Sequence, residues 1–301
     1  GGGPAMKRRP AAADAWLVVV AVGFLPAPAE SACSGRIRST ELSPTIVYDG
    51  FAALETLAVR EVRIDNTGSE DCTFWLAFYR NPAAPALLGN RLVYELRSGA
   101  GDELLSNRPP TAVPDRFLAT GIVRRGQSQR LDYQWRILRG QVVPAGRYTD
   151  AVDLRLFEAA KNTLLDARTL ALTAAVEASV SISLAGANVT SPHSYTMDFG
   201  TLAGGEQQTV QIKVRSNQRF YLEASANHGR LVMAPPYEAW AVDYVASLDG
   251  RALRFPETLG PFAATTVNGL SLPFRVTIGD VANKRAGTYR DAVTIAIVPG
   301  T

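Results

Sequence analysis

The sequence predicts an all-β protein made of two tandem β-sandwich domains, on three observations. Short runs of alternating apolar and polar residues recur along the chain, separated by Gly, Pro, Asn and Asp, and none of them has a helical period. The two halves of the chain repeat each other in order and spacing. A hydrophobic content of 47% in 301 residues is enough to bury a core in each half.

The N-terminal segment has the layout of a secretory signal. Met6–Leu25 (MKRRPAAADAWLVVVAVGFL) combines a basic start with an apolar run, and small residues follow at Ala27, Pro28 and Ala29. We therefore predict a signal peptide over residues 1–29, cleaved after Ala29, and export of the protein. The apolar run is shorter than the ~20 residues that span a bilayer, and no later run is longer, so no membrane insertion is expected.

Charge and cysteine content limit the partners. The formal net charge is +3, and removal of the basic signal leaves nearly equal numbers of basic and acidic residues, which predicts no nucleic-acid partner. The sequence has two cysteines, Cys33 and Cys72, for which a disulfide is favoured in an oxidising compartment. The alternatives are two unpaired thiols or a metal site, and the metal site lacks nearby ligands because His193 and His228 lie far along the sequence.

An internal duplication explains why one phrase occurs twice, as AGRYTDAV at Ala145–Val152 and as AGTYRDAV at Ala286–Val293. Two further pairs of segments correspond in the same order: Leu57–Asn81 with Thr209–Asn227, and Arg130–Leu138 with Ser271–Gly279. The domains are predicted over residues 30–176 and 177–301, with a short junction that lacks a Gly/Ser-rich tether. The phrase itself is expected to be architectural, with the rings of Tyr148 and Tyr289 packed and their hydroxyls bonded to a nearby loop.

The ending AGTYRDAVTIAI, together with MDFGTLAGGEQQTVQIKVRSN at Met197–Asn217, resembles the spore coat protein U domain of archaic, Csu-type chaperone–usher fimbriae. The resemblance covers about Val180–Val298 well and the first half more loosely, where the DFG stretch becomes IVYDGFAAL at Ile46–Leu54. It implies immunoglobulin-like sandwiches and a disulfide between Cys33 and Cys72. It also implies three partners, which are a periplasmic chaperone, an outer-membrane usher and the donor strand of an adjacent pilin subunit.

The two halves are predicted to end differently. After Val152–Phe157 the chain turns into Ala167–Val176, an alternating strand that can close the first domain from within. After Val293–Ile297 only VPGT follows, so the C-terminal domain is expected to be incomplete, missing its last strand. The groove that this leaves is predicted to be lined by Val180, Ile182, Leu184, Val293, Ile295 and Ile297.

In family terms this pattern resembles a secreted tip adhesin of a cell-surface fimbria. Cleavage after Ala29 would leave Glu30–Ala32 before Cys33, too short an extension to donate a strand to a neighbour. The C-terminal domain would then anchor the subunit by donor-strand complementation, and the N-terminal domain would attach to an abiotic or host surface and support biofilm formation. Candidate adhesive residues lie in proline-rich loops and are Leu87, Leu88, Val113, Phe117 and Leu118. The alternative for these side chains is that they fold back onto the sandwich.

Other functions make different demands on the sequence. An internal or minor duplicated pilin needs a longer extension before Cys33, and a periplasmic pilus chaperone needs two complete sandwiches. No nucleophile elbow, phosphate loop, dinucleotide fingerprint or metal spacing occurs, so neither enzymatic activity nor a cofactor is expected. Trp75 and Trp135 lie in alternating strands and are expected in the core rather than in a sugar-stacking platform.

Overall fold

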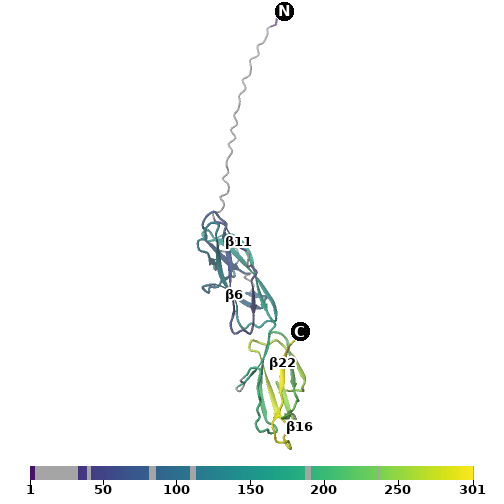
Figure 1. The fold of residues 1–301 in the computed structure, drawn as a ribbon. Helices are drawn as coiled ribbons and strands as arrows, with labels where there is room; N and C mark the ends of the chain where they lie inside the picture. The colour runs from purple at the N-terminus through teal and green to yellow at the C-terminus, as the bar shows by residue number, and fades with distance from the viewer. Residues whose placement is uncertain are drawn as a thin grey trace.

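The computed structural model describes residues 1–3, 33–38, 42–80, 86–108, 113–186, 191–235 and 237–300. Every regular element in these ranges is a β-strand, and the strands form two immunoglobulin-like β-sandwiches that lie end to end (Figure 1). The all-β prediction is confirmed. Most of the predicted signal peptide, with its cleavage site at Ala29, lies outside the described residues. Within the described ranges, no helix is long and apolar enough to cross a membrane.

The first sandwich consists of β1 (Gly35–Ile37), β2 (Thr45–Tyr48), β3 (Thr56–Asn66), β4 (Phe74–Tyr79), β5 (Leu87–Leu88), β6 (Leu92–Ser98), β7 (Leu105–Ser106), β8 (Leu118–Ala119), β9 (Ser128–Ile137), β10 (Gly146–Glu158) and β11 (Thr163–Val176). One sheet has the order β1–β3–β9–β6–β5 and the other β2–β11–β10–β4–β7, with β8 also paired to β4. Alternate side chains point inward, as Leu131, Tyr133, Trp135 and Ile137 do on β9. Trp135 therefore lies in the core, as predicted.

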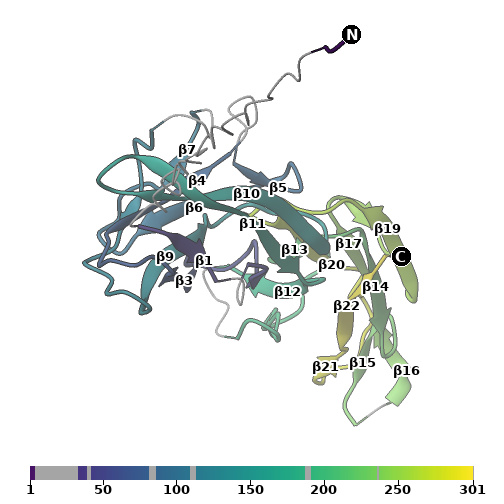
Figure 2. The same ribbon diagram turned by 90° about the horizontal axis from the view of Figure 1, so that it is seen from above.

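The second sandwich consists of β12 (Val180–Ala185), β13 (Gln207–Ser216), β14 (Phe220–Ala226), β15 (Leu231–Met233), β16 (Tyr237–Val242), β17 (Tyr244–Leu248), β18 (Arg251–Ala252), β19 (Glu257–Phe262), β20 (Leu270–Ile278), β21 (Tyr289–Arg290) and β22 (Val293–Pro299). Its sheets have the orders β12–β13–β20–β17–β18, β19–β14–β22 and β16–β15–β21. In Figure 2 the small sheet of β15, β16 and β21 lies at the far end of β22 and β14.

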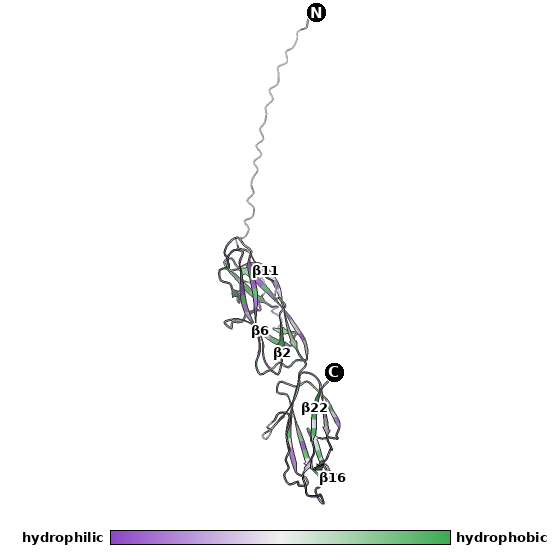
Figure 3. Ribbon diagram, viewed as in Figure 1, coloured by the Kyte–Doolittle hydropathy of each residue, from purple (hydrophilic) through white to green (hydrophobic). Residues whose placement is uncertain are grey.

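The two sandwiches share their central framework. In both, a short first strand pairs with a long second strand, which pairs with the strand of the third repeated segment, giving β1–β3–β9 and β12–β13–β20. The segments that resemble each other in sequence therefore occupy equivalent strands. Hydrophobic and hydrophilic residues alternate along the strands of both sandwiches (Figure 3), which is the pattern of sheets packed on one face.

The disulfide between Cys33 and Cys72 is present, as predicted. It ties the chain just before β1 to the segment that leads into β4. The same end of the chain is held by backbone bonds, since the N–H groups of Thr67 and Gly68 donate to the Ser34 carbonyl at 2.9 and 3.0 Å. β1 is thus fixed at the end of the first sandwich remote from the second.

The junction is short and hydrogen-bonded. β11 ends at Val176 and β12 begins at Val180, and the residues between them contact the buried side chain of Asn217. Its Nδ2 donates to the Glu177 carbonyl at 2.7 Å, and its Oδ1 accepts from the Ser179 N–H at 2.9 Å. Its own N–H donates to the Ser179 carbonyl at 3.1 Å. One side chain therefore satisfies the backbone of the connecting segment.

A candidate strand-acceptor groove

β11 closes the first sandwich by pairing with the whole of β10. The pairing is antiparallel and runs from Gly146 opposite Val176 to Glu158 opposite Thr163, with one irregularity after Leu156. Along this pairing Val152, Leu154 and Leu156 of β10 point inward and are fully buried. The core side chains that β11 itself contributes are Leu170, Leu172, Ala174 and Val176.

β22 takes the place of β10 in the second sandwich, but in the described part of the chain only one of its edges is paired. It pairs antiparallel with β14, from Ala226 opposite Val293 to Phe220 opposite Pro299, as β10 pairs with β4. No described strand lies against the other edge, where the first sandwich has β11. The backbone N–H and C=O groups along that edge are left without a ladder, which is the state that favours addition of another strand.

The six predicted groove residues lie on the two strands that border this edge. Cα atoms of β12 come within 8 Å of β22, but the two strands form no ladder. On β22 the side chains of Val293, Ile295 and Ile297 are half-buried, and on β12 Ile182 and Leu184 are half-buried as well. Val180, also half-buried, is not among the residues that pack on the core. The edge therefore combines unpaired backbone with apolar side chains that the sandwich covers only in part.

The tyrosines of the repeated phrase have the architectural role that the sequence predicts. The Tyr148 hydroxyl donates to the Pro144 carbonyl at 2.7 Å, and the Tyr289 hydroxyl donates to the Arg285 carbonyl at 2.6 Å. Each bond fixes a turn: Tyr148 fixes the turn before β10, and Tyr289 fixes the turn before β21, the short strand that precedes β22.

Sequence reasoning missed the partners of the repeated aspartates. The Tyr94 hydroxyl donates to Asp150 at 2.7 Å, and the Tyr244 hydroxyl donates to Asp291 at 2.7 Å. Arg80 also pairs with Asp150, at 2.9 Å. Burial raises the pKa of both tyrosines, and the hydrogen bond to a carboxylate raises it further, so both remain donors at neutral pH. The only sequence signal for these pairs is that Asp recurs at the same place in the phrase.

Two of the predicted adhesive residues form a short edge strand near the junction. Leu87 and Leu88 make up β5, and the Gly89 N–H that follows donates to the Thr149 carbonyl at 2.8 Å. Leu88 is 0% exposed and belongs to the first core, so the prediction that it contacts a surface is wrong. The loop folds back because Leu88 fills space beside the core that β10 and β11 enclose.

Of the other three predicted adhesive residues, Phe117 lies on the outer face of β4, whereas Leu118 packs against the main core of the first sandwich. Phe117 stacks on Trp75 with ring centroids 4.4 Å apart, in a small cluster separate from the main core. Trp75 is half-buried there, so the prediction that it lies in the core is wrong. Leu118 is half-buried in β8, and Val113 is 54% exposed. The structure thus leaves Val113 as the most accessible of the five. Parts of both predicted loops, residues 81–85 and 109–112, lie outside the described residues.

Comparison with known proteins gives no sequence match and a group of remote structural ones. No family model matches, and no curated protein matches. A chain of the CsuC–CsuE chaperone–tip adhesion subunit pre-assembly complex, from archaic chaperone-usher Csu pili of Acinetobacter baumannii, is 12% identical, with 85% of this chain and 97% of that chain covered and a TM-score of 0.42.

Two adhesins give similar values. The CupB6 tip adhesin from Pseudomonas aeruginosa is 11% identical, with 88% and 92% of the two chains covered and a TM-score of 0.41. The CFA/I enterotoxigenic E. coli adhesin CfaE, in a mutant form, is 13% identical, with 89% and 82% covered and a TM-score of 0.33. In the described residues, no group of three or more His, Cys, Asp or Glu could hold a metal ion.

Proposed function

We propose that this chain is a secreted fimbrial subunit of the archaic chaperone–usher type, and that it is the tip adhesin. Residues 177–301 form the spore coat protein U-like pilin domain, which accepts a donor strand from an adjacent subunit. Residues 30–176 form the adhesin domain, which attaches to an abiotic or host surface and supports biofilm formation. The observation that carries the proposal is that β11 covers β10, whereas the equivalent edge of β22 is unpaired in the described residues.

A donor strand would satisfy both the unpaired backbone and the partly covered apolar side chains of the open edge. Its backbone completes the ladder of β22, and its alternate side chains cover the half-buried groove residues Val293, Ile295 and Ile297. In the periplasm, a chaperone would occupy this groove. At the usher, the donor strand would then replace the chaperone. Export through the periplasm follows from the signal peptide that we predict over residues 1–29.

β11 is a template for the donor strand, because the repeated phrase leads into equivalent strands: it lies in β10 in the first sandwich, and it runs through β21 to the first residue of β22 in the second. In the first sandwich Ala174 lies opposite Tyr148, and Leu170 lies opposite Val152. Transferred to the second sandwich, these pairs place a small donor residue opposite Tyr289 and a large apolar one opposite Val293. The donor would run antiparallel to β22, with apolar residues at every second position.

The test uses the full chain and a synthetic peptide with the sequence of Thr163–Val176, which already closes one copy of this fold. Calorimetry should show the second sandwich melting at a higher temperature with the peptide, while the first sandwich melts unchanged. A control peptide in which the apolar positions are shifted by one residue should have no effect, because it presents its polar face to the groove. Unchanged melting of the second sandwich with every strand peptide tried, including donor segments of pilins, overturns the proposal.

Tip and internal positions are separated by N-terminal sequencing of the exported protein. A mature chain that starts close to Cys33 has no segment to donate and supports the tip position. An extension of about a dozen residues before Cys33 supports a duplicated pilin inside the fibre.

A further inference from the structure

An arginine band crosses the outer face of the first sandwich near its remote end. The arginines of the band lie in or next to four neighbouring strands, β11, β1, β3 and β9. The arginine side chains are between 40% and 66% exposed. The residues of this arginine band are Arg36, Arg38, Arg63, Arg130 and Arg168. We propose that the band binds a sulfated polysaccharide, a site that is independent of the groove.

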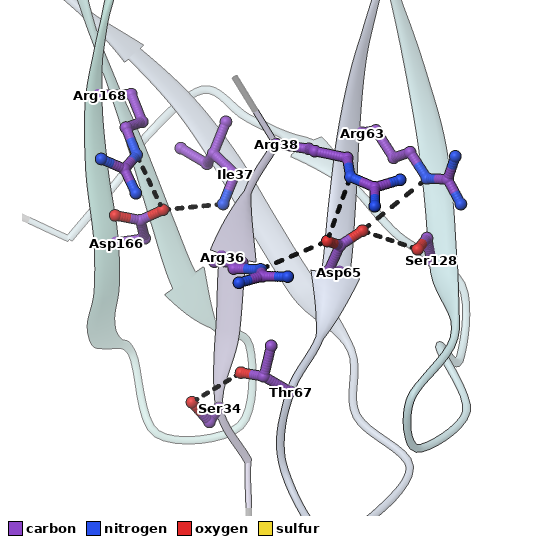
Figure 4. Close-up of polar contacts among 10 residues, drawn as sticks. All are labelled: Ser34, Arg36, Ile37, Arg38, Arg63, Asp65, Thr67, Ser128, Asp166 and Arg168. Carbon is purple, nitrogen blue, oxygen red and sulfur yellow. Dashed lines mark hydrogen bonds and ion pairs between the residues drawn. The ribbon is translucent and has the colours of Figure 1, made fainter. Parts of the chain in front are cut away.

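Three of these arginines share one carboxylate. The Nε atoms of Arg36, Arg38 and Arg63 lie 3.4, 3.7 and 3.8 Å from the Asp65 carboxylate, as Figure 4 shows. The Asp65 side chain is only 11% exposed, and it also accepts a hydrogen bond from the Ser128 hydroxyl at 2.7 Å. The single negative charge lies beneath three positive ones, so the surface that solvent meets is cationic.

The band contains a row of like charges in register. The Arg38 N–H donates to the Arg63 carbonyl at 2.9 Å, and Arg63 lies directly opposite Arg130 on β9. Like charges that face each other across adjacent strands destabilise a sheet. Arg38 and Arg63 share Asp65 with Arg36, and Arg130 pairs with Glu61 at 3.4 Å. The row therefore keeps an excess of positive charge that a bound anion would offset.

Arg168 extends the band past the edge of β1. It pairs with Asp166 at 3.3 Å, and the Asp166 carboxylate accepts from the Ile37 N–H at 2.8 Å (Figure 4). The Asp166 side chain is 15% exposed, so here too the carboxylate is covered and the guanidinium faces outward.

The duplicated domain indicates that the fold does not require this row. By strand register, the positions equivalent to Arg38, Arg63 and Arg130 are Ser183, Lys213 and Ser271, which lie side by side on β12, β13 and β20. The backbone framework is the same, but this row carries one cation in place of three. The arginines are thus specific to the first sandwich, as expected for a binding surface rather than for an architectural need.

The chemistry of the band fits sulfate groups on a linear chain. Guanidinium groups bind sulfate and phosphate through paired N–H donors and are weakly hydrated. The next row toward the junction is acidic, with Glu61 opposite Asp132, so the cationic surface is narrow. A narrow row suits a single polysaccharide chain better than a DNA duplex. The outward positions of β1, β3 and β9 carry no aromatic residue for base stacking, which disfavours single-stranded nucleic acid.

The experiment measures binding of the full chain to heparin, as a sulfated polysaccharide, and uses the row of the second sandwich as the replacement. The variant Arg38→Ser/Arg63→Lys/Arg130→Ser should bind about tenfold more weakly at ~0.15 M salt and elute from immobilised heparin at lower salt. A second variant with lysine at all three positions keeps the charge and should retain more of the binding. Thermal melting checks that each variant is folded.

A matched control removes two charges elsewhere, in the variant Arg251→Ser/Arg254→Ser of the second sandwich, and should bind as the wild type does. Desulfated heparin, which keeps the carboxylates, should bind poorly to every form. The proposal is overturned if the Ser–Lys–Ser variant binds heparin as tightly as the wild type or if the control variant loses as much. It is also overturned if duplex DNA or desulfated heparin binds the wild type more tightly than heparin does.

Discussion

Val152 and Val293 hold the same place in two copies of one phrase and on equivalent strands, but only Val152 is fully buried. Val152 lies opposite Leu170 of β11, whereas Val293 has the β14 residue Ala226 as its one strand partner in the described residues. The sequence of the strand is therefore not what exposes Val293. A single covering strand, present in one sandwich, accounts for the difference.

Truncating equivalent residues should destabilise the two sandwiches by different amounts. Leu154→Ala removes a fully buried side chain and should lower the free energy of unfolding of the first sandwich by about 2–5 kcal/mol. Ile295→Ala removes a half-buried one, so the second sandwich should lose clearly less until a donor strand covers the site. Urea unfolding with and without the peptide of Thr163–Val176 measures both. Equal losses for the two variants without peptide would contradict an uncovered groove.

Reduction of the disulfide should act on the first sandwich alone. Cys33 and Cys72 are 39 residues apart in sequence, and closing a loop of this length stabilises the fold by about 4 kcal/mol in the loop-entropy model. In calorimetry, Cys33→Ser/Cys72→Ser should lower the melting temperature of the first sandwich by the amount that this loss of stability implies. The melting temperature of the second sandwich is the internal control. A similar decrease there would show that the two sandwiches unfold together.

Asp65 should make the first sandwich sensitive to acid. Burial alone would raise its pKa, but the hydrogen bond from Ser128 and the charges of Arg38 and Arg36 outweigh burial and hold the pKa below its usual range. Because the pKa is depressed in the folded state, the stabilisation is present above about pH 4, the unfolded value, and is lost as pH falls through the folded pKa.

The measurement compares the wild type with Asp65→Asn, which cannot ionise. The difference in free energy of unfolding should be constant between pH 5 and 7, where the wild-type carboxylate is fully ionised in both states, and should shrink below about pH 4. A difference that does not change over the whole range would mean that Asp65 acts through its shape rather than its charge.

The closing strand β11 could be predicted because it depends on a local pattern. Alternation in Ala167–Val176 marks a strand with one buried face, which follows the strand that begins with the repeated phrase. The lining of the groove is predicted from the same alternation and stays a prediction; Ile182 and Ile295 are half-buried residues of β12 and β22. Repetition within one chain thus supplies an internal reference for each half.

Features that depend on contacts between distant segments could not be predicted. Leu88 follows a proline-rich stretch that reads as an exposed loop, and only its packing beside β10 buries it. The row of Arg38, Arg63 and Arg130 is formed by strand register, which the sequence does not display. Nearly balanced charge over the whole chain also conceals a local excess on one face.

Asn217 should control how firmly the two sandwiches are joined. Asn217→Ala removes the bonds to the Glu177 carbonyl and the Ser179 N–H, and leaving such buried backbone groups unsatisfied costs about 1–3 kcal/mol. Hydrogen exchange at Ser179 should accelerate, and small-angle scattering should show a broader distribution of distances within the molecule.

The matched control is Asn66→Ala, which loses bonds to Glu70 and Val123 inside the first sandwich. That variant should destabilise the first sandwich and leave the scattering unchanged. If both variants broaden the distribution equally, Asn217 is not what fixes the junction.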